Sequence, residues 1–497
     1  MSYQHPFILS IDQGTTSSRA IVFSRTMDIV NTAQKELKLH YPENGWVEQD
    51  AMDIWDDTLK SCRGAIEGGE IDVTEISAIG ITNQRETTIV WNKKTGKPIY
   101  NAIVWQDRRT ADYCRTLKDQ GHEEMIREKT GLLIDSYFSA TKIKWILDNV
   151  DGARALADRG DLLCGTVDTW LVWKLTGGAS HVTDATNASR TMLFNIQTQK
   201  WDTELLALFD IPSKMLPVVK DNVAHFGDSD AELFGGKSIP ITGMAGDQQA
   251  ALIGQACFAP GMIKSTYGTG CFALMNIGED FKLSDNRLLT TVAYRFDGKT
   301  TYALEGSIFV AGAAIQWLRD QLQVIKTAGE TADMVHETQD NGGVYLVPAF
   351  TGMGAPYWDP DARASITGLT RDSGRAHIVR AALEAQAYQT RDLTMAMEKD
   401  AGQKLTDLRV DGGMVVNDWM CQFLADMTDV SVERPPVIET TALGAAYLAG
   451  MGAGWFGSVL DISSAWRAEK QFTPNMGDDQ RQKLYAGWQL AVKRTLS

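Results

Sequence analysis

The residues best suited to chemistry in this 497-residue chain lie in short polar stretches that follow apolar runs. The first is D-Q-G-T-T-S-S-R, residues 12–19, which lies between the apolar runs 7–11 and 20–23. Glycine lets backbone N–H groups approach an anion, and hydroxyls together with N–H groups can bind phosphate oxygens. A carboxylate such as that of Asp12 suits Mg²⁺, which binds oxygen ligands and keeps several waters. The pattern predicts a β-hairpin whose tip binds phosphate and a metal, although a polar turn without a ligand has a similar composition.

Two later stretches repeat this plan. M-I-K-S-T-Y-G-T-G-C-F-A-L-M-N, residues 262–276, predicts a second hairpin with a glycine-rich, phosphate-binding turn. D-G-G at 411–413 ends an apolar run and precedes a helical pattern, so its glycines would let a nucleotide lie against the backbone at a helix start. One hairpin in each half predicts two related α/β lobes, residues 1–255 and 256–497, with a nucleotide between them.

A third set of polar residues could bind and activate an alcohol. N-Q-R-E at 83–86 and W-Q-D-R-R at 105–109 follow apolar runs, a pattern that places side chains at the carboxyl edge of an α/β sheet. Asp247 lies between a strand pattern and an alanine-rich helix, and a carboxylate there could accept the proton of a hydroxyl nucleophile. Neighbouring residues on a strand face opposite ways, so Arg85 and Glu86 can converge on one ligand only if the chain leaves the strand there. A solvated surface ion pair is the alternative.

The elements that must position these residues alternate between strands and helices. Apolar spacing predicts strands at 29–39, 76–81 and 343–350, and helices at 50–66, 139–147, 306–318 and 376–397. The segment 239–255 predicts a strand, a glycine turn and an alanine-rich helix. This alternation predicts an α/β fold.

Composition restricts the class of protein. A net charge of −15 argues against nucleic acid and anionic membrane surfaces as main partners. The six cysteines have no C-x-x-C spacing, so neither a disulfide framework nor a zinc site is indicated. The N-terminus has no basic region followed by an apolar core, and the apolar run near 442–457 is too short and glycine-rich for a membrane span. We expect a soluble cytoplasmic protein.

The three glycine-containing loops, in this order, resemble those of the actin, sugar-kinase and heat-shock ATPase fold. Y-F-S-A-T-K-I-K-W-I-L-D-N at 137–149 and A-S-I-T-G-L-T-R-D-S-G-R-A-H-I-V-R-A-A-L-E at 364–384 resemble the two signatures of the FGGY carbohydrate kinases. The resemblance implies two ribonuclease-H-like lobes with a nucleotide cleft between them. N-Q-R-E, W-Q-D-R-R, A-G-D-Q-Q-A-A and S-T-Y-G-T-G-C-F are most similar to the stretches of family members that phosphorylate glycerol.

The resemblance implies that ATP and Mg²⁺ are used to convert glycerol to sn-glycerol 3-phosphate, the first step of glycerol catabolism. Asp247 matches the general base, which also contacts glycerol. The other substrate contacts implied are Arg85, Glu86, Tyr137 and Gln248 on the hydroxyls, and Trp105 and Phe272 as aromatic walls. Asp12 matches the metal-side carboxylate; Thr15, Thr16, Ser17 and Arg19 match the β/γ-phosphate contacts; and Thr269, Gly312, Gln316, Gly413 and Asn417 match the remaining nucleotide contacts.

Two alternative functions remain open. The shared phosphate loops say nothing about the acceptor, so another polyol or sugar, such as xylulose or erythritol, is the second candidate. A non-catalytic nucleotide-binding protein of the actin or chaperone sort is the third, although it would not need Arg85, Glu86 and Trp105. For Trp105 and Phe272 the alternative is plain core packing.

The resemblance also bears on assembly and regulation. It implies a homo-oligomer, a dimer or tetramer. Family members inhibited by a sugar bisphosphate carry a longer loop with added glycines and an arginine, whereas F-G-G-K-S-I-P at 234–240 has neither. We therefore do not expect that inhibition, and we interpret His225 as an ordinary surface histidine.

Overall fold

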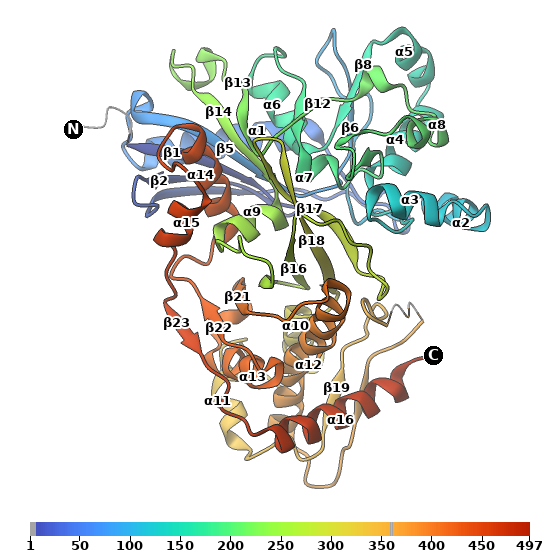
Figure 1. Ribbon diagram of the computed structural model, residues 1–497, viewed down its shortest axis with the longest axis vertical. Helices are drawn as coiled ribbons and strands as arrows, with labels where there is room; N and C mark the ends of the chain where they lie inside the picture. Colours follow the sequence, from blue (N-terminus) through green and yellow to red (C-terminus); the bar gives the residue numbers. More distant parts are fainter. Residues whose placement is uncertain (1–5, 358, 360) are drawn as a thin grey trace.

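The computed structural model describes residues 6–357, 359 and 361–497, and Figure 1 shows two lobes stacked along the long axis. The first lobe contains a six-stranded sheet in the order β13-β14-β5-β1-β2-β3, and the second a seven-stranded sheet in the order β17-β18-β16-β15-β21-β22-β23. The strands of the first sheet are β1 (Phe7–Gln13), β2 (Ser17–Ser24), β3 (Ile29–Glu36), β5 (Ile76–Asn83), β13 (Val223–Asp228) and β14 (Pro240–Gly246). Those of the second are β15 (Met262–Tyr267), β16 (Cys271–Gly278), β17 (Leu289–Phe296), β18 (Lys299–Ile308), β21 (Asp407–Asp411), β22 (Val432–Arg434) and β23 (Lys470–Phe472).

The two sheets share one plan. In the first, β1 pairs antiparallel with β2 and parallel with β5, and β5 pairs parallel with β14. In the second, β15 pairs antiparallel with β16 and parallel with β21, and β21 pairs parallel with β22. Each lobe therefore combines a hairpin with parallel strands, as the repeated loops predicted. The two-lobe α/β fold is confirmed.

Helices cover both faces of the first sheet, because its strands alternate apolar side chains between two cores. Leu9 and Ile11 pack with α1 (Ala51–Gly68) and α6 (Val167–Leu175), whereas Ile8 packs in a second core with α9 (Asp247–Gly254) and α14 (Thr440–Gly452). Helix α14 comes from the C-terminal half of the chain, yet it lies beside β1 and β5 in Figure 1. Its Ala442 carbonyl accepts a 2.7 Å hydrogen bond from Ser10 Oγ on β1.

The other helices belong to the second lobe or to a helical extension of the first. In the second lobe lie α10 (Gly312–Asp320), α11 (Glu330–Met334), α12 (Arg375–Ala401), α13 (Asp418–Thr428) and α16 (Asp478–Thr495). The extension has its own core and holds α2 (Ala111–Asp119), α3 (Glu123–Thr130), α4 (Ser139–Asn149), α5 (Ala153–Arg159) and α8 (Thr203–Leu208). Two short helices, α7 (Ala185–Ala188) and α15 (Val459–Ala465), complete the set.

In the described part of the chain, ten short strands lie outside the two large sheets. They form the pairs β4 (Glu48–Gln49) with β7 (Ala102–Ile103), β6 (Ile89–Asn92) with β8 (Leu162–Gly165), β9 (Val182–Asp184) with β12 (Val218–Lys220), β10 (Phe194–Asn195) with β11 (Lys200–Trp201), and β19 (Tyr345–Val347) with β20 (Ser365–Thr367).

The predicted start of one helix is wrong. The helix expected over 306–318 begins only at Gly312, because residues up to Ile308 extend β18 and pair with β16 through Cys271. The predicted strands 29–39 and 343–350 are shorter, ending at Glu36 and covering only Tyr345–Val347. The ends of the other predicted helices lie within four residues of the ends of α1, α4 and α12.

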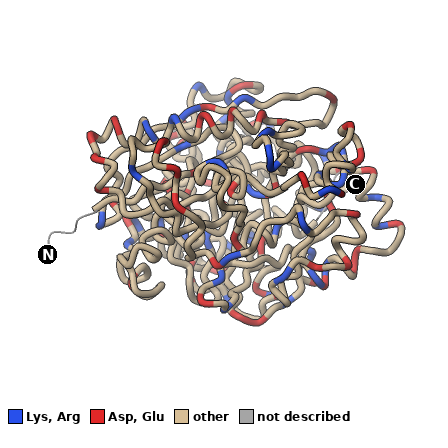
Figure 2. The backbone as a smooth tube through the Cα atoms, turned by 90° about the horizontal axis from the view of Figure 1, so that it is seen from above, with Lys and Arg blue, Asp and Glu red and all other residues tan. Residues whose placement is uncertain are grey.

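Charge is distributed along the whole molecule. Figure 2 shows Lys and Arg interspersed with Asp and Glu along the backbone. Among the described residues, none of the helices has the length and apolar character needed to cross a membrane.

Candidate active site

The polar loops of each lobe start at one edge of its sheet. In the first lobe the strand ends are in register, with Gln13 opposite Asn83 and Asn83 opposite Gly246. The hairpin tip, the loop after Asn83 and the start of α9 therefore leave the sheet side by side. In the second lobe Thr266 pairs with Asp411, so the tip of the β15–β16 hairpin and the glycine turn after β21 also lie at one edge.

Arg85 and Glu86 sit where the chain leaves β5. That strand ends at Asn83, and Glu86 has a φ of 60°, a left-handed conformation unusual for glutamate. The expected departure from the strand is confirmed. The two residues are only 2% and 1% exposed, so a solvated surface pair is excluded.

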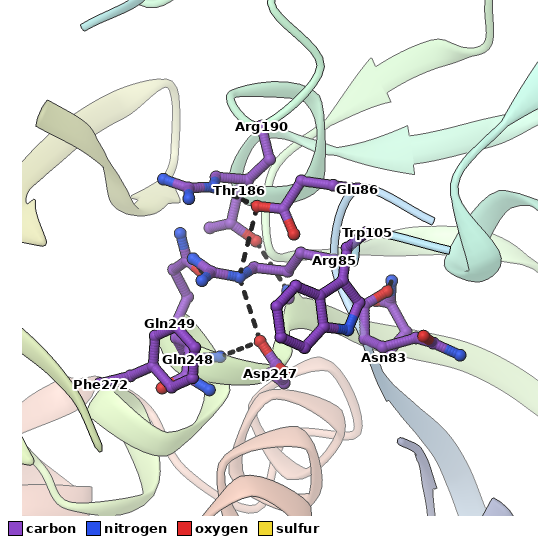
Figure 3. A network of polar contacts seen from close by, with 12 residues as sticks. Asn83, Arg85, Glu86, Trp105, Thr186, Arg190, Asp247, Gln248, Gln249 and Phe272 are labelled. Carbon is purple, nitrogen blue, oxygen red and sulfur yellow. Dashed lines mark hydrogen bonds and ion pairs between the residues drawn. The ribbon is translucent and has the colours of Figure 1, made fainter. Parts of the chain in front are cut away.

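Asp247 contacts both Arg85 and Gln248 (Figure 3). It is the first residue of α9, and its Oδ1 lies 3.1 Å from Arg85 Nε and accepts a 2.7 Å hydrogen bond from the backbone N–H of Gln248. No described residue donates a hydrogen bond to Oδ2. The Asp247 side chain is 30% exposed, against 2% for Arg85. One carboxylate oxygen is therefore held, and the other can accept a proton from a bound molecule.

Two residues that the sequence analysis missed complete a buried charge cluster. Glu305 on β18 accepts hydrogen bonds from Arg85 Nη1 at 2.6 Å and Nη2 at 2.9 Å. Arg190, which follows α7, donates to Glu305 at 3.0 Å through Nη2 and to Glu86 at 2.6 Å through Nε. Burial alone would raise the pKa of Glu305, but the guanidinium groups of Arg190 and Arg85 lower it to about 2. Burial raises the pKa of Glu86 despite the same two cations.

A weak sequence signal for both missed residues exists. Glu305 is the one charged residue in the run T-Y-A-L-E-G-S-I, and Arg190 is the one in N-A-S-R-T-M-L-F. A charged side chain inside an apolar run is buried only when it is paired, which implies a partner without identifying it.

Three aromatic rings border the Arg85–Asp247 pair. The ring centroid of Trp105 lies 5.6 Å from that of Tyr137 and 6.4 Å from that of Phe272. The Trp105 indole also donates a 2.8 Å hydrogen bond to Thr15 Oγ1 in the first hairpin tip. All three rings are only partly buried, which favours a binding wall over plain core packing. Because Phe272 is on β16, this wall includes residues of both lobes.

Asp12 is the second-last residue of β1, the first strand of the hairpin, and its environment suits a divalent cation. Burial, followed by the carboxylates of Glu439 and Asp247, raises its pKa to about 7 against the lowering effect of Arg19. A nearby cation would favour its ionised form. The described residues hold no group of three or more His, Cys, Asp or Glu that could bind a metal, but Mg²⁺ commonly uses one carboxylate, phosphate oxygens and waters. The residues present therefore fit Mg²⁺ bound together with a nucleotide.

The other residues of the first hairpin tip are arranged around a tight turn. Gly14 N–H donates a 2.9 Å hydrogen bond to the Ser17 carbonyl, and Thr16 is exposed at the tip. Arg19 is partly buried; it donates a 2.8 Å hydrogen bond to Gln34 and forms an ion pair with Glu439, which precedes α14.

The predicted nucleotide contacts of the second lobe lie around the start of α10. Thr269 O accepts 2.9 Å and 3.0 Å hydrogen bonds from the N–H groups of Ala311 and Ala313. A Cβ at Gly312 would lie 2.6 Å from the Gly268 carbonyl oxygen, so only glycine fits there. Gln316 and Gly413 are exposed, and Asn417 caps α13 and donates a 3.3 Å hydrogen bond to Thr331.

The structure thus forms two groups of predicted residues. Around Arg85 and Asp247 it brings together the predicted substrate contacts; around the start of α10 it brings Thr269 next to Gly312. No described contact joins the second group directly to Asp247. The β15–β16 hairpin connects them, because it carries Thr269 at its tip and Phe272 beside Trp105.

Most of the chain matches known protein families and structures. Residues 7–254 match the N-terminal domain, and residues 263–453 the C-terminal domain, of the FGGY family of carbohydrate kinases. A glycerol kinase of Alcanivorax borkumensis is 60% identical over 489 residues, 98% of each chain. A crystal structure of Plasmodium falciparum glycerol kinase with ADP has a TM-score of 0.94 at 39% identity, covering 99% of this chain and 98% of that one. A ligand-bound xylulose kinase from Lactobacillus acidophilus, 23% identical with a TM-score of 0.88, covers 98% of this chain and 97% of that one and shares the fold.

Proposed function

This chain belongs to the FGGY family of carbohydrate kinases, and from that premise we infer that it is an ATP-dependent glycerol kinase. It transfers the γ-phosphoryl group of ATP to a terminal hydroxyl of glycerol and releases ADP and sn-glycerol 3-phosphate. The observation that carries this function is the Asp247 carboxylate, held by Arg85 through one oxygen and presenting the other inside a partly aromatic site.

Asp247 acts as the general base. Its Oδ2 accepts the proton of the attacking hydroxyl as the new O–P bond forms and the bond to the ADP oxygen breaks. Phosphoryl transfer needs little more from the protein than positioning and neutralisation of charge. Arg85 supports both needs, because Glu305 holds its guanidinium group while its Nε contacts Asp247.

The remaining substrate contacts hold the other hydroxyls and the carbon chain. Arg85 and Gln248 donate hydrogen bonds, and Glu86 accepts them. Burial raises the pKa of Tyr137, so its hydroxyl stays protonated and can donate as well. Trp105 and Phe272 cover the carbon chain and exclude bulkier acceptors.

The two hairpin tips, α10 and the turn between β21 and α13 hold the nucleotide. Thr15, Thr16, Ser17 and Arg19 contact the β- and γ-phosphates, and Thr269, Gly312, Gln316, Gly413 and Asn417 make the remaining contacts. Asp12 holds Mg²⁺, which neutralises phosphate charge when bound. Support for this assignment is that both tips leave their sheets beside other polar loops of the site.

A coupled ADP-release assay tests the function. Glycerol, xylulose, erythritol and other polyols are offered at equal concentration with ATP and Mg²⁺. We expect glycerol to give the highest rate and no ADP release without an acceptor above a low background. A higher rate with another polyol would assign a different FGGY activity, and nucleotide binding without polyol-stimulated release would assign a binding protein.

Three further proposals concern the whole chain. The lobe boundary lies near residue 255, between the two matched family domains, with α14 returning to the first sheet. A cytoplasmic location is supported by six cysteines that are all free and buried. The homo-oligomer implied by the sequence stays a prediction, which sedimentation velocity at several protein concentrations would test.

A further inference from the structure

Lys264 is a buried lysine next to the proposed substrate contacts, to which no role has been given so far. It lies on β15 opposite Leu274 of β16 and is 0% exposed. Its ammonium group donates hydrogen bonds to Gln248 Oε1, to Thr266 Oγ1 at 3.1 Å and to the Phe272 carbonyl at 3.3 Å. An ammonium group has three N–H donors, so these three acceptors satisfy it completely.

This arrangement is unusual because the cation is paired with no carboxylate. No described Asp or Glu lies within ion-pair distance of Lys264, and the negative charges of Asp411 and Asp247 act on it only from further away. Burying an ammonium group costs several kcal/mol unless other interactions compensate. Two of its three acceptors belong to Gln248 and Phe272, both proposed to contact the substrate.

The donor character of Lys264 decides how Gln248 is oriented. The oxygen and nitrogen of a carboxamide have nearly the same shape, but an ammonium group cannot accept a hydrogen bond. The Gln248 oxygen must therefore face Lys264, and its NH₂ group must face away. The Gln248 side chain is partly exposed, and no described residue accepts a hydrogen bond from its Nε2.

We propose that Lys264 is a positioning residue, which locks the carboxamide of Gln248 so that its NH₂ group faces the bound polyol. The proposal rests on the proposed glycerol site. It follows that Gln248 offers the substrate only a donor, and that a substrate hydroxyl must accept there. Without Lys264, the amide can turn over, and a hydroxyl placed to accept would then meet an oxygen.

A double-mutant cycle tests this coupling. Lys264→Met, Gln248→Ala and the double variant are compared with the wild type for kcat and for the KM of glycerol and ATP. Each single change should raise the KM of glycerol by up to about tenfold, the value of one hydrogen bond, and leave the KM of ATP within about twofold. The double variant should match Gln248→Ala within about twofold, because Lys264 acts through Gln248. The proposal would be overturned if the two single fold-changes in the KM of glycerol multiplied in the double variant. It would also be overturned if Lys264→Met left the KM of glycerol unchanged.

Two further variants separate positioning from folding. Gln248→Glu keeps Lys264 and gives it a carboxylate partner, so thermal stability should not fall, yet the donor to the polyol is lost and the KM of glycerol should rise. An unchanged KM in this variant would also overturn the proposal. Lys282→Met is the matched control, since Lys282 donates to the Ala401 carbonyl on another part of the second lobe and should leave both KM values unchanged.

Failure of this proposal differs from failure of the proposed function. If the wild type does not phosphorylate glycerol, the function is wrong before any variant is made. If the wild type is active and the cycle shows no coupling, only the role of Lys264 is wrong.

Discussion

Asp247 has one carboxylate oxygen that Arg85 and the start of α9 hold, and no described residue donates a hydrogen bond to the other. Asp247→Asn keeps the shape and the hydrogen bond from Gln248 N–H but cannot accept the proton. We expect kcat to fall by about 10²–10⁴-fold, the usual contribution of a general base, with ATP binding unchanged. Steady-state kinetics and calorimetric titration of ATP measure the two quantities. A kcat near that of the wild type would show that another group accepts the proton.

Glu305 balances a buried cluster of two arginines and two glutamates. Glu305→Gln leaves Arg190 with only the Glu86 carboxylate and Arg85 with Glu86 and the partly exposed Asp247. Breaking a buried ion pair from one side typically costs about 3–5 kcal/mol. We expect the free energy of unfolding in urea at pH 7 to fall by this order. The double variant Arg190→Gln/Glu305→Gln restores the charge balance and should recover part of the loss. A double variant with the sum of both single losses would contradict the charge argument.

The same residue gives a pH dependence with a definite sign. The pKa of Glu305 is lowered from 4.5 to about 2 in the folded protein. A lowered carboxyl pKa stabilises the folded state above the unfolded pKa, and this contribution is lost as the pH falls towards the folded value. The stability difference between wild type and Glu305→Gln should therefore be constant above about pH 4.5 and shrink between about pH 4.5 and 2. If the stability difference instead grew as the pH fell from about 4.5 to 2, the pKa of Glu305 would be raised in the folded protein.

The sequence could predict Arg85 and Asp247 but not Glu305 or Lys264. The first two follow apolar runs at the carboxyl edge of a sheet, where position in the pattern implies exposure to a cleft. Glu305 and Lys264 lie inside strands, and their roles depend on partners across the lobes that strand periodicity does not identify.

At the scale of elements, the crossing of α9 and α14 sets the position of Asp247. A Cβ on Gly444 would lie 1.8 Å from the Ala250 carbonyl oxygen, and one on Gly254 would lie 2.0 Å from the Thr440 carbonyl oxygen. The two backbones touch because neither glycine has a side chain. Since Asp247 is the first residue of α9, pushing the helices apart would move this proposed general base.

Gly444→Ala should therefore reduce both stability and turnover. Overpacking of this kind lowers the free energy of unfolding by about 1–3 kcal/mol. A displaced Asp247 should lower kcat, whereas the KM of ATP should change less. Urea unfolding and steady-state kinetics measure the two effects. Gly329→Ala is the matched control, because Gly329 is exposed and has a φ of −60°. A Cβ added there would meet only the Thr327 hydroxyl, at 3.9 Å. If Gly444→Ala behaved like this control, the close crossing would have no role.

Element types were predictable where turn chemistry and periodicity agree. Both hairpins could be predicted, because in each a glycine-containing turn separates two apolar runs. The start of α10 was not, since the pairing of β18 with β16 keeps residues up to Ile308 in the strand. The apolar composition of α14 on all sides predicts a buried helix but does not say which sheet buries it.

At the scale of the whole molecule, the buried charge cluster beside Asp247 joins the two lobes. Arg85, Glu86 and Arg190 come from the first half of the chain, and Glu305 from the second sheet. Repeated loops in the sequence predicted two lobes, yet the buried ion pairs between them join residues more than 100 positions apart, which no local pattern reveals.

The proposed nucleotide contacts are divided between the lobes, and this division predicts closure. The phosphates would contact the tip at residues 12–19 in the first lobe, whereas the remaining contacts, around Thr269 and Gly413, lie in the second. A ligand that binds both lobes favours the conformation in which both sets of contacts form, so the population shifts towards a closed cleft. The Arg85–Glu305 ion pair already joins the lobes beside the substrate site, so movement should be largest at the outer, nucleotide side of the cleft.

Small-angle X-ray scattering measures this closure through the radius of gyration. We expect a decrease when ATP, Mg²⁺ and glycerol are added together to Asp247→Asn, which binds them with little turnover, and a smaller decrease with either ligand alone. ADP with glycerol on the wild type is the control for effects of the substitution. An unchanged radius of gyration in both experiments would contradict closure and mean that the two lobes keep a fixed separation when the ligands bind.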